Sequence, residues 1–354
     1  MVHYYLALAN CFMDGMNWCY FMNYEKPLRA IGERGIIKVL SDIVPYPTNA
    51  ILPFGDDVSG LYVNGRRLLL KVDAFSEIYS RYYWMDLYDL GWKAVTMVVS
   101  DFVVKLAKPS MAVVSFGAPS NRHLGDIVNL FKGLSDAAKY YNLYIVGGDT
   151  NESRYDLWIS ISAISLDDFK YTPSRFNAKV GDIVVTSGEY GITGLANYIH
   201  YNRIDIESLP DDLKKKVLDK TKRPIARVDL LDKLKEIAPY ITSSIDVSDG
   251  LVQTLYDLSE ASNVTIELDN IPIDPLVKAY AEENKINAVN LALHGGEEFE
   301  VIFTISQEQK DMLHDLMSHY NLDLHVIGKV VNKGEVGVYL RGHLLERKGW
   351  EYFR

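Results

Sequence analysis

Hydrophobic spacing divides the first half of the chain into helices and strands. Apolar residues at helical spacing predict a helix that begins at Glu33 and is ended by Pro45. Asn64-Gly65 stands between two apolar runs and predicts a β-hairpin, with Asp56 and Asp57 at its entry and Asp73 closing its second strand. Helices are expected over residues 86–105 and 124–141, and strands over 111–116 and 157–164.

The apolar run Leu143–Val146 predicts a buried strand that leads into Gly147-Gly148-Asp149-Thr150. In the second half, strands are expected at 182–187 and 264–268, and helices near 195–200 and within 211–235. The segment 243–250, SSIDVSDG, is expected to end a strand and start a helix. Gly295-Gly296-Glu297 is expected to precede a late strand.

Length and element order predict a mixed α/β (α+β) protein of two domains. A chain of 354 residues exceeds what one hydrophobic core usually serves. We expect an N-terminal extension of uncertain role over residues 1–24, a first domain over 25–170 and a second over 171–354. The boundary is placed at Tyr171–Ser174, where Pro173 interrupts the pattern.

Composition excludes several classes of function. The net charge of -10, from 37 basic and 47 acidic residues, has the wrong sign for a nucleic-acid-binding protein. No apolar run reaches the length of a membrane span, so no membrane partner is expected. Two cysteines, Cys11 and Cys19, cannot build a disulfide scaffold, and we expect a cytoplasmic protein. Residues 1–24 are apolar but lack the basic start of a signal peptide.

Aspartates carry the informative chemistry because six of them adjoin apolar runs. They are Asp57, Asp73, Asp101, Asp149, Asp246 and Asp249. A buried carboxylate is costly unless it is paired, protonated or bound to a cation, and few basic residues neighbour these positions in the sequence. A shared Mg²⁺ would satisfy several of them, since Mg²⁺ prefers oxygen ligands. The alternative is that each aspartate separately caps a helix or stabilises a turn.

A glycine-rich turn, Gly188 to Gly194, precedes one of the expected helices. Such a turn can receive phosphate through backbone N–H groups, although glycine is equally needed for a tight turn from strand to helix. The P-loop, protein-kinase, GxSxG and HExxH signatures are missing from the sequence. The eight histidines are scattered, and none is expected to be catalytic.

Seven motifs in this order resemble the thiamine-monophosphate kinase family of the aminoimidazole-ribonucleotide-synthase-like superfamily. They are Gly32-Glu33, Gly55-Asp56-Asp57, Val72-Asp73, Ser100-Asp101, Gly147–Thr150, Asp246–Leu251 and Gly295–Glu300, and Lys348–Phe353 extends the likeness to the end of the chain. The resemblance implies an N-terminal sheet domain that pairs in a homodimer and a C-terminal α/β domain. ATP and Mg²⁺ would lie between the two domains.

The resemblance also implies a role for each matching residue. The six aspartates named above would hold Mg²⁺, with Asp249 on a further ion. Gly148, Arg175 and Ser248 would contact ATP, while Glu297 and Trp350 would face a small phosphorylated acceptor, thiamine monophosphate. The nucleophile is then a phosphate monoester, whose second pKa of about 6 leaves it mostly ionised at neutral pH. No general base is needed, so no catalytic residue is assigned.

Three departures from the family pattern bear on the acceptor. Lys71-Val72 replaces the usual pair of hydroxyl residues before Asp73, Ser80 stands where the family has a substrate-contacting histidine, and Asn151-Glu152 follows the GGDT motif. Lys71 either replaces part of one Mg²⁺ charge or points to solvent. Besides a kinase that makes thiamine diphosphate, two alternatives stay open: a superfamily relative with another acceptor, such as a ligase, and a nucleotide-binding protein that has lost catalysis.

Overall fold

The computed structural model describes residues 25–353. The predicted extension over residues 1–24 lies outside the described residues. The described chain forms two compact units, a large one of residues 46–350 and a small one of residues 25–45 with 351–353. The small unit contains the 3₁₀ helix η2 (Leu28–Ala30) and the helix α2 (Gly32–Ser41). Helix α2 ends at Ser41, four residues before Pro45 and so earlier than expected.

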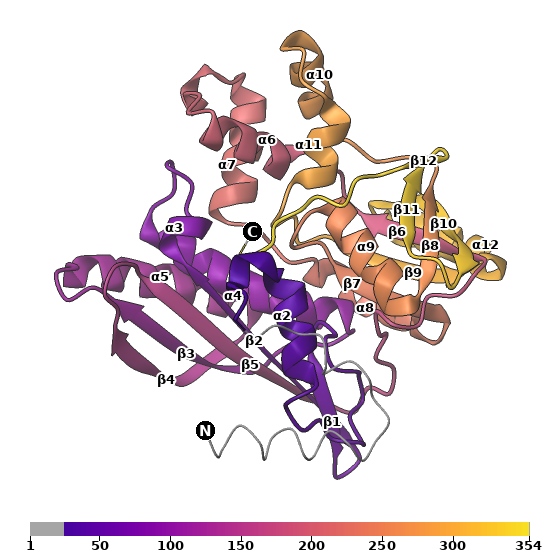
Figure 1. The fold of residues 1–354 in the computed structure, drawn as a ribbon, viewed down its shortest axis with the longest axis horizontal. Helices are drawn as coiled ribbons and strands as arrows, with labels where there is room; N and C mark the ends of the chain where they lie inside the picture. The colour runs from indigo at the N-terminus through magenta and orange to yellow at the C-terminus, as the bar shows by residue number, and fades with distance from the viewer. Residues whose placement is uncertain (1–24, 354) are drawn as a thin grey trace. The chain divides into compact units, whose positions relative to one another are not determined.

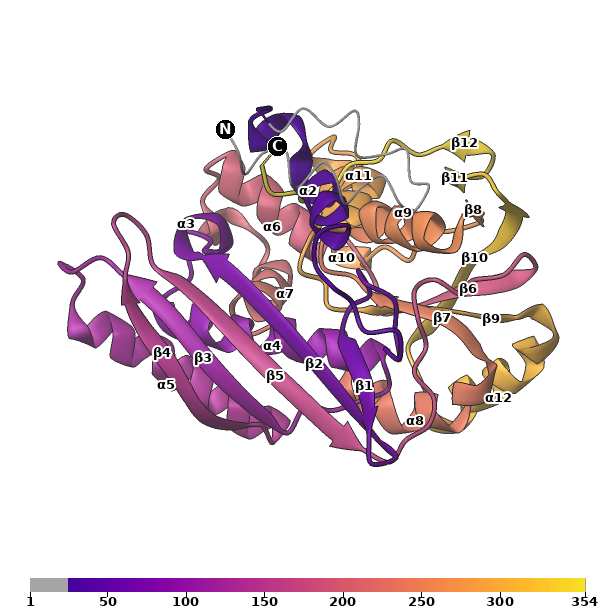
Figure 2. The same cartoon turned by 60° about the horizontal axis from the view of Figure 1, so that its bottom comes forward.

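The first sheet of the large unit has five strands in the order β1-β2-β5-β3-β4 (Figure 2). Its strands are β1 (Ser59–Val63), β2 (Arg66–Ser76), β3 (Met111–Ala118), β4 (Tyr144–Glu152) and β5 (Trp158–Asp167). Asn64 and Gly65 both have positive φ, as a two-residue hairpin turn requires, so the predicted β1–β2 hairpin is confirmed. Strand β2 continues three residues beyond Asp73, which therefore lies inside the strand.

Helices α4 (Leu87–Val104) and α5 (Leu124–Tyr141) cover one face of this sheet, and the short helix α3 (Glu77–Ser80) follows β2. Asp86 starts α4 by accepting a hydrogen bond from the Asp89 backbone, while the Asp89 side chain accepts from Asp86. Helix α4 is buried on nearly every side because it packs on β2 and β5 and also on β7 and β9 of the second sheet. Its polar residues are therefore held in the interior.

Strand β4 differs from the sequence expectation in both length and burial. It runs through Gly147–Thr150 to Glu152, and all of its residues are exposed. The expectation of a buried strand was wrong because, within residues 25–353, β4 is an edge strand that pairs only with β3. Its apolar residues Tyr144 and Val146 are 66% and 61% exposed in the single chain.

The second sheet has seven strands in the order β12-β11-β8-β10-β6-β9-β7 (Figure 1). They are β6 (Asp182–Ser187), β7 (Ile241–Asp246), β8 (Val264–Leu268), β9 (Val301–Ser306), β10 (Leu324–Lys333), β11 (Gly337–Leu340) and β12 (His343–Leu344). Strand β6 is buried throughout because its two faces pack into different hydrophobic cores. Ile183 and Val185 belong to one core, and Val184 belongs to the other.

Helices alternate with the strands of the second sheet along the chain. They are α6 (Ile192–Tyr201), α7 (Asp211–Lys222), α8 (Leu231–Glu236), α9 (Leu251–Ser262), α10 (Pro275–Glu283), α11 (Ala288–His294) and α12 (Lys310–Tyr320), with 3₁₀ turns η3 (Ile206–Ser208), η4 (Val228–Leu230), η5 (Ala238–Tyr240) and η6 (Gln307–Gln309). The mixed α/β class with two sheets is confirmed. Across residues 25–353, every helix is too short or too polar to cross a membrane.

Candidate metal and acceptor site

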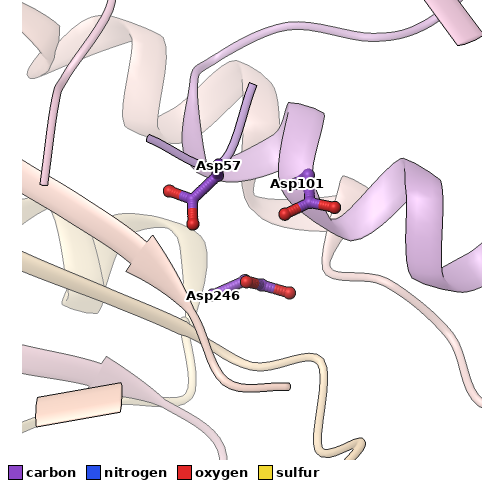
Figure 3. A group of neighbouring side chains, drawn as sticks. All are labelled: Asp57, Asp101 and Asp246. Atoms are coloured by element: carbon purple, nitrogen blue, oxygen red, sulfur yellow. The ribbon is translucent and has the colours of Figure 1, made fainter. Parts of the chain in front are cut away.

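Three buried aspartates from distant parts of the sequence meet in the large unit (Figure 3). Asp57 lies in the turn before β1, Asp101 is on α4, and Asp246 is the last residue of β7. One carboxylate oxygen from each lies within 4.8 Å of the other two. Helix α4 makes this meeting possible because it packs against both sheets at once.

Basic side chains neutralise the Asp57 end of this group. Lys105, at the end of α4, places its Nζ 2.7 Å from the carboxylates of Asp56 and Asp57, and Arg175 also pairs with Asp57. Burial raises the pKa of Asp57, but Arg175 and Lys105 outweigh it and lower that pKa to about 2. The basic partners that the sequence does not place beside Asp57 are supplied by the fold. The fold brings Arg175 in from 118 residues away.

Lys71 joins Asp73 to the same group. Its Nζ lies 3.2 Å from Asp73 Oδ1 and 3.0 Å from Asp101 Oδ2, and its side chain is 23% exposed. Burial lowers the pKa of Lys71, but Asp101 and Asp73 outweigh it and raise that pKa above its ordinary value. Of the two alternatives for Lys71, the structure favours the one in which its charge lies among the carboxylates.

Asp246 is surrounded differently, since its Oδ2 accepts a hydrogen bond of 2.8 Å from the Ser100 hydroxyl. Burial and the nearby Asp57 raise the pKa of Asp246 to about 6, and burial raises that of Asp101 well above its ordinary value. These carboxylates are therefore costly to ionise without a further cation. Hard oxygen donors in a close group are the ligands that Mg²⁺ prefers, so the donor set fits this ion.

The other two predicted Mg²⁺ ligands lie outside this close group. Asp149 is on β4, which is three strand spacings from β2, or roughly 14 Å across the sheet. Together with Gly148 it lines a cavity of about 270 Å³ beside Phe116 and Phe131. Asp249 follows Asp246 in the loop before α9, and the predicted ATP ligand Ser248 lies in the same loop.

The predicted acceptor residues Ser80, Glu297 and Trp350 are brought close together in the fold. The Lys93 Nζ contacts both the Ser80 carbonyl and, at 2.9 Å, Glu297 Oε2. The backbone of Glu297 donates to the Ser248 carbonyl at 2.6 Å, and that of Trp350 donates to the Asp249 carbonyl at 3.0 Å. Both residues are thereby attached to the loop that follows Asp246.

Tyr79 adds an aromatic ring that the sequence analysis did not single out. Its ring centroid lies 6.0 Å from that of Trp350, at an interplanar angle of 60°. The two side chains are 62% and 37% exposed, so much of this aromatic pair faces solvent. A cationic ring can bind against such a pair through the negative faces of the aromatic rings.

The glycine-rich turn before α6 serves packing. A Cβ at Gly188 would meet the carboxylate of Glu300, and one at Gly194 would meet the backbone of Leu291. At the start of α6, Glu298 Oε1 accepts a hydrogen bond of 2.7 Å from the Thr193 hydroxyl. The chain's own carboxylate already lies at this helix N-terminus, so the geometry favours the tight turn over a phosphate site.

Two buried lysines, Lys93 in α4 and Lys105 directly after it, were not predicted as site residues. Their side chains are 1% and 0% exposed. A signal was available, because both stand in or directly after a largely apolar helix, and Lys105 lies about one turn beyond Asp101. A lysine inside an apolar helix needs a buried partner, which pointed to a carboxylate elsewhere in the fold.

Comparison with known proteins agrees with the two-sheet architecture. The family described as AIR synthase related protein, N-terminal domain, matches residues 55–166, and its C-terminal counterpart matches residues 179–341. The thiamine-monophosphate kinase of Pyrococcus abyssi is 33% identical over 84% of this chain and 90% of its own. That of Aquifex aeolicus is 29% identical over 92% of this chain and 99% of its own.

Among solved structures, AaThiL complexed with AMPPCP and TMP superposes with a TM-score of 0.79 at 27% identity. The match covers 93% of this chain and 99% of that one. The two family models match the residues of both sheets, and the named relatives match over most of their own length. These matches agree on one family. The chain belongs to the thiamine-monophosphate kinase family of the AIR synthase-related superfamily.

Proposed function

We propose that this chain transfers the γ-phosphoryl group of ATP to thiamine monophosphate and so makes thiamine diphosphate. The observation that carries the proposal is the meeting of Asp57, Asp101 and Asp246 in the interior. The loop that directly follows Asp246 makes the contacts to Glu297 and Trp350. The relative AaThiL, which binds AMPPCP and TMP, supports both the donor and the acceptor.

Mg²⁺, when bound, neutralises charge on the phosphates. We assign its binding to Asp57, Asp73, Asp101 and Asp246, with Asp149 and Asp249 as further ligands. The chain's own part is to hold two polyanions in line and to screen their repulsion. The acceptor phosphate is mostly ionised at neutral pH, so the reaction needs no side chain to remove a proton.

Gly148, Arg175 and Ser248 are assigned to ATP. Arg175 pairs with Asp57, so its guanidinium lies at the rim of the carboxylate group, where a phosphate oxygen can be bound in a forked geometry. Ser80, Glu297 and Trp350, with Tyr79, are assigned to the acceptor. A carboxylate beside two aromatic rings suits a cationic thiazolium ring.

The active form is proposed to be a homodimer that pairs through the first sheet. On the face opposite α4, exposed apolar residues occupy matching registers, with Leu70 and Met111 both opposite Ile164, and Val72 and Val113 both opposite Ser162. A contiguous apolar face of this kind is typical of an interface between protein chains.

The function is tested by incubating the purified protein with ATP, Mg²⁺ and a panel of phosphorylated acceptors, and separating the products by chromatography. Thiamine diphosphate formation supports the proposal. Turnover of a different acceptor would assign the chain to the ligase-like alternative. Binding of ATP without turnover of any acceptor would assign it to a nucleotide-binding protein that has lost catalysis.

A further inference from the structure

The carboxylate group contains a cation that belongs to the chain itself. Lys71 is on β2, two residues before Asp73, so both side chains point to the sheet face that packs on α4. Asp101 approaches from α4, and the Lys71 Nζ lies 3.2 Å from Asp73 and 3.0 Å from Asp101. The ammonium therefore bridges a strand carboxylate and a helix carboxylate.

Charge is distributed unevenly over the site. Asp57 is neutralised by Lys105 and Arg175, and Asp73 and Asp101 share Lys71. The Asp246 carboxylate accepts a hydrogen bond from the neutral hydroxyl of Ser100. Two carboxylates share the single ammonium of Lys71, so one negative charge is left between Asp73 and Asp101 and a second lies on Asp246.

A fixed ammonium and a divalent cation compete for the same oxygens. Both need carboxylate ligands at close range, and two cations a few ångströms apart repel each other strongly where water is largely excluded. The Lys71 ammonium is attached to the strand through its side chain. Its effective concentration at the two carboxylates is therefore high.

We propose that Lys71 takes the cation position between Asp73 and Asp101, so that the site binds one divalent ion fewer than it would with a neutral residue at 71. The remaining divalent ion is held on the side of Asp246, whose carboxylate accepts a hydrogen bond from the neutral Ser100 hydroxyl. This inference rests on the proposed function for the existence of a divalent-cation site, and it concerns the number of ions rather than the identity of the acceptor.

The test counts bound Mn²⁺, used as a paramagnetic substitute for Mg²⁺. Free Mn²⁺ is measured by electron paramagnetic resonance while the ion is titrated into the full-length protein, with and without AMPPCP. Lys71→Met keeps the length of the stem and removes the charge, and Lys71→Thr gives a second neutral variant with a good strand former. Lys108→Met, at an exposed lysine near the end of α4, is the matched control.

Both Lys71 variants are expected to bind one more Mn²⁺ per chain than the wild type, or to bind Mn²⁺ at least about tenfold more tightly, because a repelling unit charge is removed. Mn²⁺ should also raise the melting temperature of the variants more than that of the wild type. The inference would be overturned if the wild type, both Lys71 variants and the control bound the same number of Mn²⁺ ions with the same affinity. It would also be overturned if none of these four proteins bound Mn²⁺. Since no acceptor is present, failure of thiamine monophosphate as a substrate would leave this result intact.

Discussion

Lys93 Nζ donates a hydrogen bond to Glu297 Oε2 over 2.9 Å and thereby ties α4 to the loop before β9. The lysine is 1% exposed and the glutamate side chain 29% exposed. Glu297 also has a φ of +60°, in the left-handed region that is uncommon for residues other than glycine. The ion pair therefore holds this strained residue in one orientation, while the same ammonium holds the carbonyl of Ser80.

The unequal burial of this pair predicts unequal effects on stability. Glu297→Gln leaves a buried ammonium without its counter-charge and should cost up to about 3 kcal/mol of unfolding free energy. Lys93→Met leaves a carboxylate that water can reach, so it should cost only about 1 kcal/mol. Urea denaturation of the two variants measures this difference. Equal losses, or a larger loss in Lys93→Met, would contradict the role of burial.

Asp101→Asn should keep the fold and abolish Mg²⁺-dependent turnover. Removing one of several clustered negative charges relieves repulsion in the metal-free protein and weakens cation binding. The melting temperature in EDTA should therefore stay level or rise while ATP turnover is lost. Asp168→Asn, at an exposed aspartate, is the control and should change neither. A large loss of stability with normal specific activity would show that Asp101 is structural.

Tyr79 is expected to contribute to acceptor affinity through its contact with Trp350. Tyr79→Ala should weaken thiamine monophosphate binding by roughly tenfold, or about 1.4 kcal/mol, while Tyr79→Phe retains it. Titration calorimetry with AMPPCP present makes the comparison, and unchanged affinity of Tyr79→Ala would show that the ring is not used.

Ser80→His tests the same loop by adding a side-chain contact to the acceptor instead of removing one. The contact from Lys93 is to the backbone carbonyl of Ser80, so this substitution leaves that contact in place. The variant should gain part of the affinity that a hydrogen-bonding ring supplies, on the order of 1 kcal/mol. Thiamine monophosphate binding that is unchanged or weaker than in the wild type would show that this position does not approach the acceptor.

Glu300 predicts a specific dependence of stability on pH. Its carboxylate lies 2.8 Å from Lys220 and 2.7 Å from Arg227. Burial raises the pKa of Glu300, but Lys220 and Arg227 outweigh it and lower that pKa to about 2. A lowered pKa in the folded state means that the stabilisation is complete above the unfolded-state pKa of 4.5 and is lost as the pH falls toward 2.

Glu300→Gln should therefore flatten the pH dependence of unfolding between about pH 4 and pH 3. The slope should fall by about one proton, or about 1.4 kcal/mol per pH unit. Urea denaturation of both proteins across this range gives the two slopes. Parallel curves would show that Glu300 has the same pKa in the folded and unfolded states.

Local signals predicted much of the fold. The Asn64-Gly65 hairpin, helix α5 and the strands β6 and β8 were all expected, because turn residues and hydrophobic period act over a few residues. The exposure of β4 could not be predicted in this way. Whether an apolar strand is central or at an edge depends on the order of strands in the sheet, which local periodicity does not encode.

The candidate site was predicted only in part for a similar reason. Asp57, Asp101 and Asp246 stood out because each adjoins an apolar run. Their basic partners did not, since the contact of Lys71 with Asp101 depends on how β2 packs against α4. Lys93 and Glu297 are 204 residues apart, and only the packing of α4 between the two sheets brings them together.

The most direct measurement follows the γ-phosphoryl group of ATP. ATP labelled with ¹⁸O in that group is incubated with the protein, Mg²⁺ and thiamine monophosphate, and the products are separated and examined by mass spectrometry. We predict that the label appears in thiamine diphosphate, with one labelled product for each ADP formed. Label found only in inorganic phosphate, with thiamine monophosphate unchanged, would contradict the account.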